Sequence, residues 1–125
     1  MYNLELTIAS PLRVLLKETS HMVLLPALEG EIGVLYNHIP VIVSLNFGLI
    51  KLVDSKNKIT TSFYIDGGVA RVTNTSVDVI CNYMTESNGL NTEKLSAKMK
   101  LIASLAGKND KMEFYKKIHQ YLQQQ

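Results

Sequence analysis

Glu29, Glu31 and His38 stand close together in the sequence, within the stretch from Leu28 to Pro40. Carboxylates and imidazoles act as general acids and bases and bind metal ions, so these residue types could support either chemistry. No second carboxylate–histidine set accompanies them, and no His/Cys spacing in the chain fits a metal site. We therefore interpret all three as exposed loop residues, and we expect no metal site, no cofactor and no catalytic residue.

The residues around them predict a short strand between two tight loops. Gly30 and Gly33 can adopt positive φ without steric cost. Pro40 biases the residue before it towards an extended backbone. A strand from Ile32 to Leu35 would then present the two carboxylates and the imidazole at one end of a β structure.

Other residues with chemical potential have simpler structural interpretations. His21 and His119 are expected on a strand surface and a helix surface. Cys81 alternates with apolar positions, which predicts a buried, inert thiol. The stretch Asp66-Gly67-Gly68 predicts a turn, because no Lys-Ser/Thr pair follows it to complete a phosphate loop.

Composition indicates an ordinary globular protein of 125 residues, with 46% apolar and 19% charged residues. The single cysteine excludes an intrachain disulfide. A formal charge of +2 is too small to indicate a nucleic-acid partner. The sequence contains no apolar run approaching the roughly 20 residues that span a bilayer, and no secretory signal is visible.

Two patterns divide the chain into expected domains of 1–86 and 87–125. In the first part, short runs alternate with period two between polar turns, which predicts a β-sandwich or flattened barrel of about eight to ten strands. The runs lie at 4–8, 14–16, 21–25 (ended by Pro26), 32–35, 41–45, 49–53, 59–65, 69–72 and 77–81. The fold class is therefore α+β in two parts.

The second part changes to helical spacing, with Leu95, Met99 and Ile102 on one face. Asn91 is the expected N-cap of this helix. Gly107, followed by Lys108, is its expected C-cap. A second helix would start at Asn109–Asp110, with Asp110 and Glu113 as a loose capping box. Its apolar side would hold Met112, Tyr115, Ile118 and Leu122, so we expect an antiparallel helical hairpin.

Charge differs between the two parts. Residues 1–86 carry six basic and eight acidic side chains, a net of −2, whereas residues 87–125 carry seven lysines and three acids, a net of +4. Such lysines usually form a solvent-exposed helix face. The more specific alternative is that they bind an acidic surface on a partner protein. The lysines are Lys94, Lys98, Lys100, Lys108, Lys111, Lys116 and Lys117.

Three blocks taken together carry a family resemblance: Leu28–Pro40, Leu45–Leu52 and Phe63–Val69. In this order, followed by a helical hairpin, they resemble the epsilon subunit of F-type ATP synthases and its mitochondrial delta and chloroplast epsilon counterparts. The spacing agrees over nearly the whole chain. One departure is Tyr36, where the family commonly has proline.

The resemblance implies a non-catalytic subunit of the central stalk. In the family, the sandwich lies between the gamma subunit and the ring of membrane c subunits, rotates with both, and helps to couple proton flow to ATP synthesis. Glu31 matches the position whose loop faces the polar loops of the ring. Glu29, Gly30, Gly33 and His38 belong to the same loop system and are the expected partner-binding residues.

The resemblance also implies a regulatory hairpin that extends towards the catalytic alpha and beta subunits and inhibits ATP hydrolysis. Some members bind ATP at the start of the first helix. Here Asn91 replaces an aspartate, Lys94 an arginine and Leu95 an alanine. Lysine cannot form a planar bidentate contact, so we expect weak ATP binding or none.

The missing transit peptide favours a bacterial enzyme, with this subunit peripheral on the cytoplasmic face of the inner membrane and associated with the membrane only through the complex. The alternative function is a free-standing β-sandwich binding module with a helical tail. Co-purification with gamma would distinguish the two. A chemical role for Glu31 and His38 ranks third.

Overall fold

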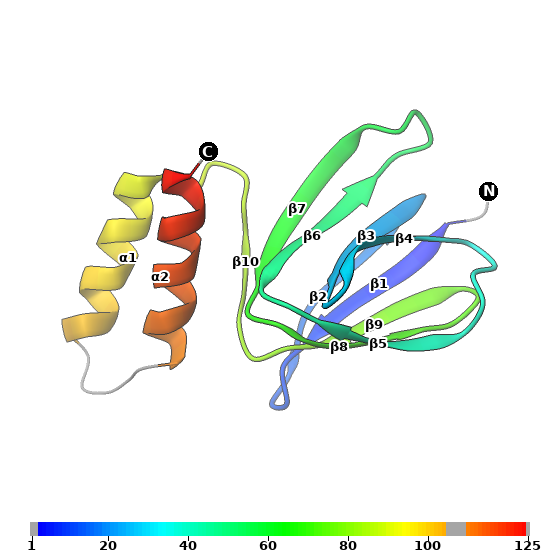
Figure 1. Cartoon of the computed structure of the whole chain (residues 1–125), viewed down its shortest axis with the longest axis horizontal. Helices are drawn as coiled ribbons and strands as arrows, with labels where there is room; N and C mark the ends of the chain where they lie inside the picture. The colour runs from blue at the N-terminus through cyan, green and yellow to red at the C-terminus, as the bar shows by residue number, and fades with distance from the viewer. Residues whose placement is uncertain (1–2, 105–109, 125) are drawn as a thin grey trace. The chain divides into compact units, whose positions relative to one another are not determined.

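The structure is a computed structural model, and it describes residues 3–104 and 110–124. The chain divides into two compact units, Met1–Glu86 and Ser87–Gln125. Within the described residues, the first unit holds ten strands and the second two helices (Figure 1). Their bounds are β1 Leu4–Ala9, β2 Val14–Ser20, β3 Met22–Ala27, β4 Gly30–Leu35, β5 Val41–Leu45, β6 Gly48–Val53, β7 Ile59–Ile65, β8 Gly68–Val72, β9 Ser76–Ile80, β10 Met84–Glu86, α1 Thr92–Ser104 and α2 Asp110–Gln123.

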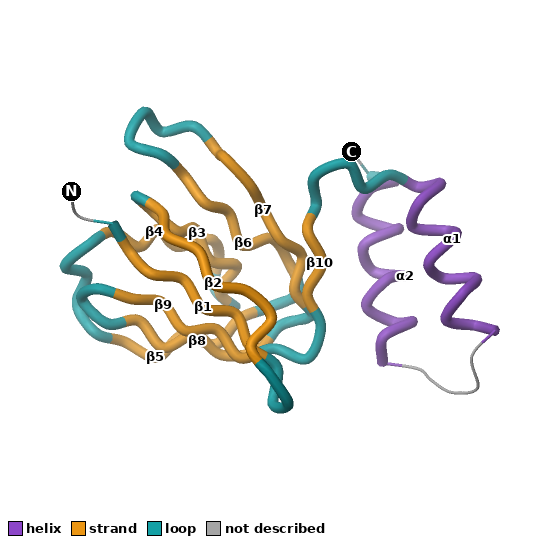
Figure 2. The backbone as a smooth tube through the Cα atoms, turned by 180° about the vertical axis from the view of Figure 1, so that it is seen from behind, coloured by secondary structure: helices purple, strands orange, loops and turns teal. Residues whose placement is uncertain are grey.

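The strands form two sheets that face each other across one core (Figure 2). The first sheet has the order β10-β7-β6-β3-β4, and the second has the order β5-β8-β9-β1-β2. One residue pair, Ala27 with Leu45, joins the sheets between β3 and β5. Neighbouring strands are antiparallel except β1 and β9, which are parallel. The predicted β-sandwich is confirmed.

Alternation along the strands produces the core between the sheets. In β1, for example, Leu4, Leu6 and Ile8 are buried, and the residues between them face outwards. Full burial of such a side chain stabilises a fold by about 1.5–3 kcal/mol. The core cluster consists of Leu4, Leu6, Ile8, Val23, Leu25, Val34, Leu45, Ile50, Leu52, Phe63, Ile65, Ala70, Val72, Val77, Val79 and Cys81.

The turn at Asp66–Gly68 takes the chain from β7 in the first sheet to β8 in the second, as the glycine pair suggested. Gly68 has φ of 136°, and a Cβ there would collide with the carbonyl oxygen of Ile80. The Asp66 Oδ1 accepts hydrogen bonds from the backbone N–H groups of Asn82 (3.1 Å) and Tyr83 (3.0 Å). The carboxylate thus ties this turn to the segment that returns the chain to the first sheet.

Pro26 does not end β3, so that expectation is wrong. The strand continues through it, with Pro26 opposite Glu31 of β4. The Pro26 carbonyl accepts a hydrogen bond from the Asn46 N–H at 2.8 Å, on the side away from β4. Because the N and C=O of a strand residue point to the same side, the missing N–H removes no bond to β4. Pairing with β6 has already ended at Leu24.

Helix α1 starts where the sequence predicts. The Asn91 Oδ1 accepts the backbone N–H of Lys94 at 2.9 Å, which is the N-cap bond. The predicted C-cap at Gly107 and Lys108, and the predicted cap residue Asn109, lie outside the described residues. The side chains of Ile102 and Asp110 also lie outside them.

The two helices lie side by side and run antiparallel (Figures 1 and 2). Leu95 and Ile118 are fully buried and Tyr115 nearly so, in agreement with the predicted apolar faces. Phe114, which the predicted face omitted, is also buried. The Lys98 ammonium of α1 lies over the Tyr115 ring of α2, 5.8 Å from its centroid, and this cation–π contact joins the helices.

Cys81 follows β9 and is only 3% exposed, so the prediction of a buried thiol is confirmed. Burial raises the pKa of the thiol from 9.0 to about 12, and the negative charge of Asp66 adds to this shift. The group is therefore a protonated thiol at neutral pH, which is a poor nucleophile.

We expect Gly68→Ala to destabilise the sandwich more than Gly30→Ala. Both glycines have positive φ, 136° and 127°, so both substitutions impose backbone strain, of about 1–3 kcal/mol. Only at Gly68 does the added Cβ also collide with a backbone carbonyl, because nothing lies within 4 Å at Gly30. The measurement is urea unfolding of the full chain followed by circular dichroism. Equal losses at the two positions would contradict this account of the crossing.

We expect the native chain to lose stability relative to Cys81→Ala as pH rises from 9 towards 12. In this window the unfolded thiol releases its proton and the native thiol keeps it, so the unfolded state is favoured as pH rises. Urea midpoints of both proteins at about pH 8 and about pH 10 would measure the difference. An unchanged difference between the two pH values would show that the native thiol ionises normally.

Candidate docking surfaces

The β3–β4 turn presents Glu29 and Gly30 to solvent, and Gly30 has the positive φ that the sequence allowed, 127°. The next residue, Glu31, lies in β4. Its carboxylate forms an ion pair with the Lys51 ammonium of β6 at 3.1 Å. The side chains of Lys51 and Glu31 are 28% and 47% exposed, so the pair contributes at most about 1 kcal/mol. The pair reaches across β3, from β4 to β6, and at this strength it does not lock the Glu31 side chain.

The loop around His38 is held by its own backbone and by a neighbouring loop. The His38 N–H donates to the Leu35 carbonyl at 3.0 Å, and its Nδ1 lies 2.7 Å from the Ile39 carbonyl oxygen. Asn37 has φ of 69° and donates its N–H to the Asn74 carbonyl at 2.7 Å. His38 is thus a positioned, half-buried residue beside the β8–β9 loop.

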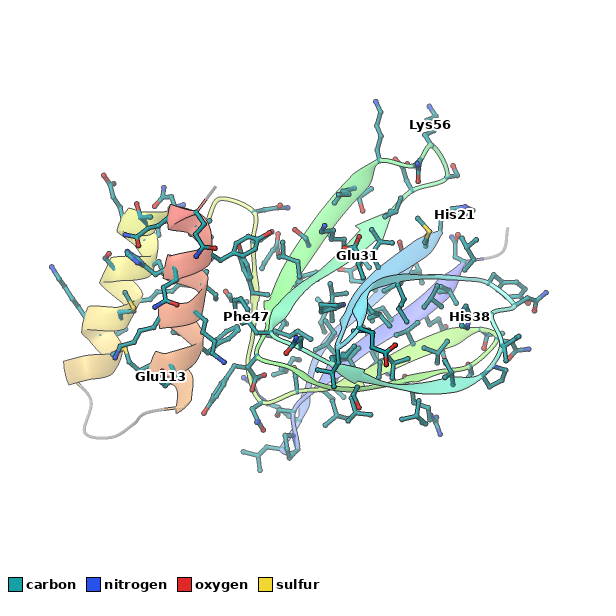
Figure 3. The ribbon with its side chains drawn as sticks, viewed as in Figure 1. His21, Glu31, His38, Phe47, Lys56 and Glu113 are labelled. Atoms are coloured by element: carbon teal, nitrogen blue, oxygen red, sulfur yellow. The ribbon has the colours of Figure 1, made fainter. Side chains whose placement is uncertain are left out.

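The expectation that Glu29, Glu31 and His38 share one end of the β structure is wrong. The strand β4 begins at Gly30 and ends at Leu35, so the glutamates precede or open the strand and the histidine follows it. Six extended residues separate the two ends by roughly 20 Å. Figure 3 shows Glu31 and His38 well apart. The three groups cannot act together on one atom.

Gly33 meets a requirement for space and not for positive φ. It lies inside β4 opposite Leu24, and a Cβ at this position would lie 3.3 Å from the Leu24 Cδ2. The outer surface of β4 therefore carries no side chain at Gly33, next to the Glu31–Lys51 ion pair.

Among the described residues, no group of three or more His, Cys, Asp or Glu side chains is placed to hold a metal ion. His21 is exposed and lines a cavity of about 640 Å³ at the end of the sandwich, together with Thr19 and Asp54. The Asp54 Oδ1 accepts hydrogen bonds from two backbone N–H groups of its own loop. His119 is half-buried on α2, at a shallow groove between the helices.

Sequence reasoning missed an apolar surface on the outer side of the second sheet. We call it the apolar face, and it consists of Val14, Ile42, Val69 and Ile80, which are 53%, 64%, 44% and 50% exposed. Val69 is opposite Ile80, and Ile80 is opposite Ala9, which in turn is opposite Val14. Three of the four residues thus lie in one row across β8, β9, β1 and β2, and Ile42 lies on β5.

A charged pair adjoins this row. The Arg71 guanidinium lies 3.3 Å from the Asp78 carboxylate, and Arg71 is opposite Ile42.

The sequence did contain a signal for the apolar face. Val41, Ile42 and Val43 are consecutive, and an uninterrupted apolar run in a strand places apolar side chains on both faces of the sheet.

Six of the seven lysines in the hairpin are described, and all six are exposed. Lys108 lies outside the described residues. Besides Lys98, which covers Tyr115, one has a charged neighbour: the Lys116 ammonium lies 3.7 Å from the Glu113 carboxylate. The exposed lysines are Lys94, Lys98, Lys100, Lys111, Lys116 and Lys117.

Two of the three substituted positions of the nucleotide motif, Asn91 and Leu95, have a structural role in the hairpin. Asn91 caps α1, and Leu95 is fully buried. The Lys94 ammonium lies beside the backbone of Gly89, 3.7 Å from the point where a Cβ would be. The structure describes no helix that is long and apolar enough to cross a membrane.

Comparison with known proteins identifies relatives of the sandwich and of most of the chain. The family described as "ATP synthase, Delta/Epsilon chain, beta-sandwich domain" matches residues 3–87. An ATP synthase epsilon chain of Gluconacetobacter diazotrophicus is 30% identical over 112 residues, which cover 90% of this chain and 79% of the relative. An epsilon chain of Rickettsia bellii is 40% identical over 73 residues, covering 58% and 68%.

Two solved structures share the fold. A chain of the Euglena gracilis mitochondrial ATP synthase, in a structure of OSCP, F1 and c-ring, has a TM-score of 0.65 at 21% identity, covering 93% of this chain and 74% of that one. A chain of the Tetrahymena thermophila mitochondrial ATP synthase, in a structure of the central stalk and c-ring, has a TM-score of 0.53 at 14% identity, covering 93% and 96%. With a matching sandwich family and a relative similar over most of both chains, this chain belongs to the delta/epsilon family of ATP synthase subunits, as a non-catalytic epsilon subunit of the F-type enzyme.

Proposed function

We propose that this subunit links gamma to the ring of c subunits at the foot of the central stalk, and transmits the rotation of the ring to the sites of ATP synthesis. The apolar face is the observation that carries the proposal. Exposed apolar patches on a folded domain indicate a protein interface. The Tetrahymena chain of the same fold comes from a structure of a central stalk and c-ring, which supports this setting.

The apolar face is suited to bind gamma. Its residues come from β2, β5, β8 and β9, which are hydrogen-bonded within one sheet or through β1. A surface built on paired strands yields little under load, because the close-packed core beneath it has low compressibility. The Arg71–Asp78 pair at its side supplies polar groups that fix the register of the partner.

The turn bearing Glu29 and Gly30 is suited to meet the polar loops of the c-ring. The neighbouring Glu31 forms a half-exposed ion pair with Lys51, and Gly33 adds no side chain to the adjacent surface. His38 lies at the other end of β4, in the loop that leads to β5 and its exposed Ile42. We therefore assign the expected partner-binding residues from Glu29 to Gly33 to the c-ring, and we assign His38 to the gamma side.

The hairpin is proposed to regulate ATP hydrolysis by reaching an acidic surface on the alpha and beta subunits. Such a switch requires two hairpin positions within a few kcal/mol of each other. The exposed lysines supply the charge. Because Asn91 caps α1, Leu95 is buried and Lys94 cannot form a planar bidentate contact, we propose that nucleotide binds weakly or not at all.

The proposed location is the cytoplasmic face of a bacterial inner membrane, where the subunit is peripheral and is held by gamma and the ring. Relatives in Gluconacetobacter and Rickettsia support a bacterial enzyme. This location follows from the partners, since the subunit would contact the membrane only through the complex.

We expect Ile80→Asp to weaken binding of the full-length subunit to purified gamma by at least ~10-fold, because a charge would be desolvated within the apolar contact. Titration calorimetry measures the affinity. Ile80 is half exposed in the free subunit, so the substitution leaves the core cluster intact.

The matched control is Ile59→Asp. Ile59 is 56% exposed, close to the 50% of Ile80, but it lies on β7 of the first sheet. The Ile59→Asp variant should bind gamma with the affinity of the unchanged chain. Urea midpoints of both variants would verify that they fold. Unchanged affinity of Ile80→Asp, or equal loss in both variants, would refute the assignment of the apolar face to gamma.

We expect the assembled enzyme to hydrolyse ATP faster when this subunit ends at Glu86 than when it is complete. The difference should shrink as salt rises, because exposed charges are screened within about 10 Å at 0.1 M salt. Hydrolysis assays at several salt concentrations measure both effects.

Charge-neutral variants provide the control for this test. Exchange of Lys111, Lys116 and Lys117 for glutamine should relieve inhibition in the same direction as the truncation. The same exchange at Lys17, Lys56 and Lys58 of the sandwich should not. Inhibition that is insensitive to both salt and the hairpin lysines would exclude an electrostatic contact.

A further inference from the structure

The sequence contains one Asn-Gly pair, Asn88-Gly89, and it lies in the segment that joins β10 to α1. Both residues are exposed. An asparagine followed by glycine is the pair most prone to intramolecular attack, because glycine has no side chain to hinder approach of its backbone nitrogen to the amide carbon. The position is also the start of the second compact unit, which begins at Ser87.

The local backbone forms a tight turn around this pair. The Leu90 N–H donates to the Ser87 carbonyl at 3.1 Å, and Gly89 has φ of 74°. The Gly89 nitrogen belongs to the central peptide of the turn, which the closing hydrogen bond does not use. The reacting nitrogen and the Asn88 side chain are thus on adjacent residues at the exposed tip.

A cation lies beside the pair. The Lys94 ammonium is 3.7 Å from the point where a Cβ of Gly89 would be. A positive charge near the reacting atoms favours the deprotonated form of a backbone nitrogen and stabilises an oxyanion. Both species occur when a backbone nitrogen attacks an amide, so Lys94 is placed to promote the reaction.

We propose that Asn88 is a site of spontaneous deamidation. The Gly89 nitrogen attacks Asn88 Cγ, a new C–N bond forms, and the bond from Cγ to Nδ2 breaks. Ammonia leaves with the proton that the Gly89 nitrogen loses, and a cyclic succinimide remains. Water then opens the ring at either carbonyl, which yields aspartate in the original backbone or isoaspartate with an extra backbone carbon.

Deamidation would add one negative charge beside Lys94, where the hairpin begins. The new carboxylate would lie near the start of α1, whose N-terminal dipole favours negative charge. The isoaspartate product would also lengthen the segment between the sandwich and the hairpin. Aged and fresh subunits would therefore differ in charge and in linker geometry.

The test is peptide mapping by mass spectrometry of the full chain, incubated at mildly alkaline pH and sampled over time. The internal control is Asn57, which is exposed, has φ of 65° and is followed by lysine. We expect conversion at Asn88 at least ~10-fold faster than at Asn57, because glycine removes the steric barrier. Equal rates at the two sites would overturn the proposal.

Lys94→Gln tests whether the Lys94 charge accelerates deamidation of Asn88 in the folded chain. We expect it to slow conversion of Asn88 by roughly threefold to fivefold, the effect of one nearby charge at a wet surface. The slowing should disappear in concentrated urea, where Lys94 no longer lies beside Gly89. An unchanged rate in the folded variant, or equal slowing in urea, would refute the role of Lys94.

Discussion

Two segments that cross between the sheets run side by side and hold the sandwich closed. One carries the chain from β7 to β8, and the other carries it from β9 to β10. Gly68 lets the first approach the carbonyl of Ile80, and the Asp66 carboxylate accepts the N–H groups of Asn82 and Tyr83 on the second. The two segments are thus joined by a close backbone approach at Gly68 and by hydrogen bonds to the charged Asp66 side chain. It also sets the environment of Cys81, whose pKa is raised by burial and by that carboxylate.

Local patterns predicted the elements well wherever one physical rule determined them. Alternation gave β7 its bounds, Ile59–Ile65, and the preference of asparagine for N-caps located the start of α1. Pro26 misled the prediction, because a proline is compatible with a strand when its nitrogen faces no partner. Which side of β3 carries a partner at that point depends on strands distant in sequence, and no local pattern encodes it.

The candidate docking residues follow from the resemblance to a family and not from chemistry, and their binding role stays a prediction. The resemblance indicated the segment from Glu29 to His38, but the separation of Glu31 from His38 depends on where β4 starts and ends. The apolar face was missed because its members are scattered along four strands. Only the strand order brings Val14 and Ile80 to either side of Ala9. A surface made in this way is a property of topology.

The parallel pairing of β1 with β9 has a consequence for biogenesis. Glu5 of the first strand is opposite Ser76, so the amino-terminal strand has no partner on that side until most of the sandwich has been synthesised. Pairings of such large sequence separation are slow to form, because loop closure must precede them. A nascent chain paused before residue 76 would expose the edge of β1 on the ribosome.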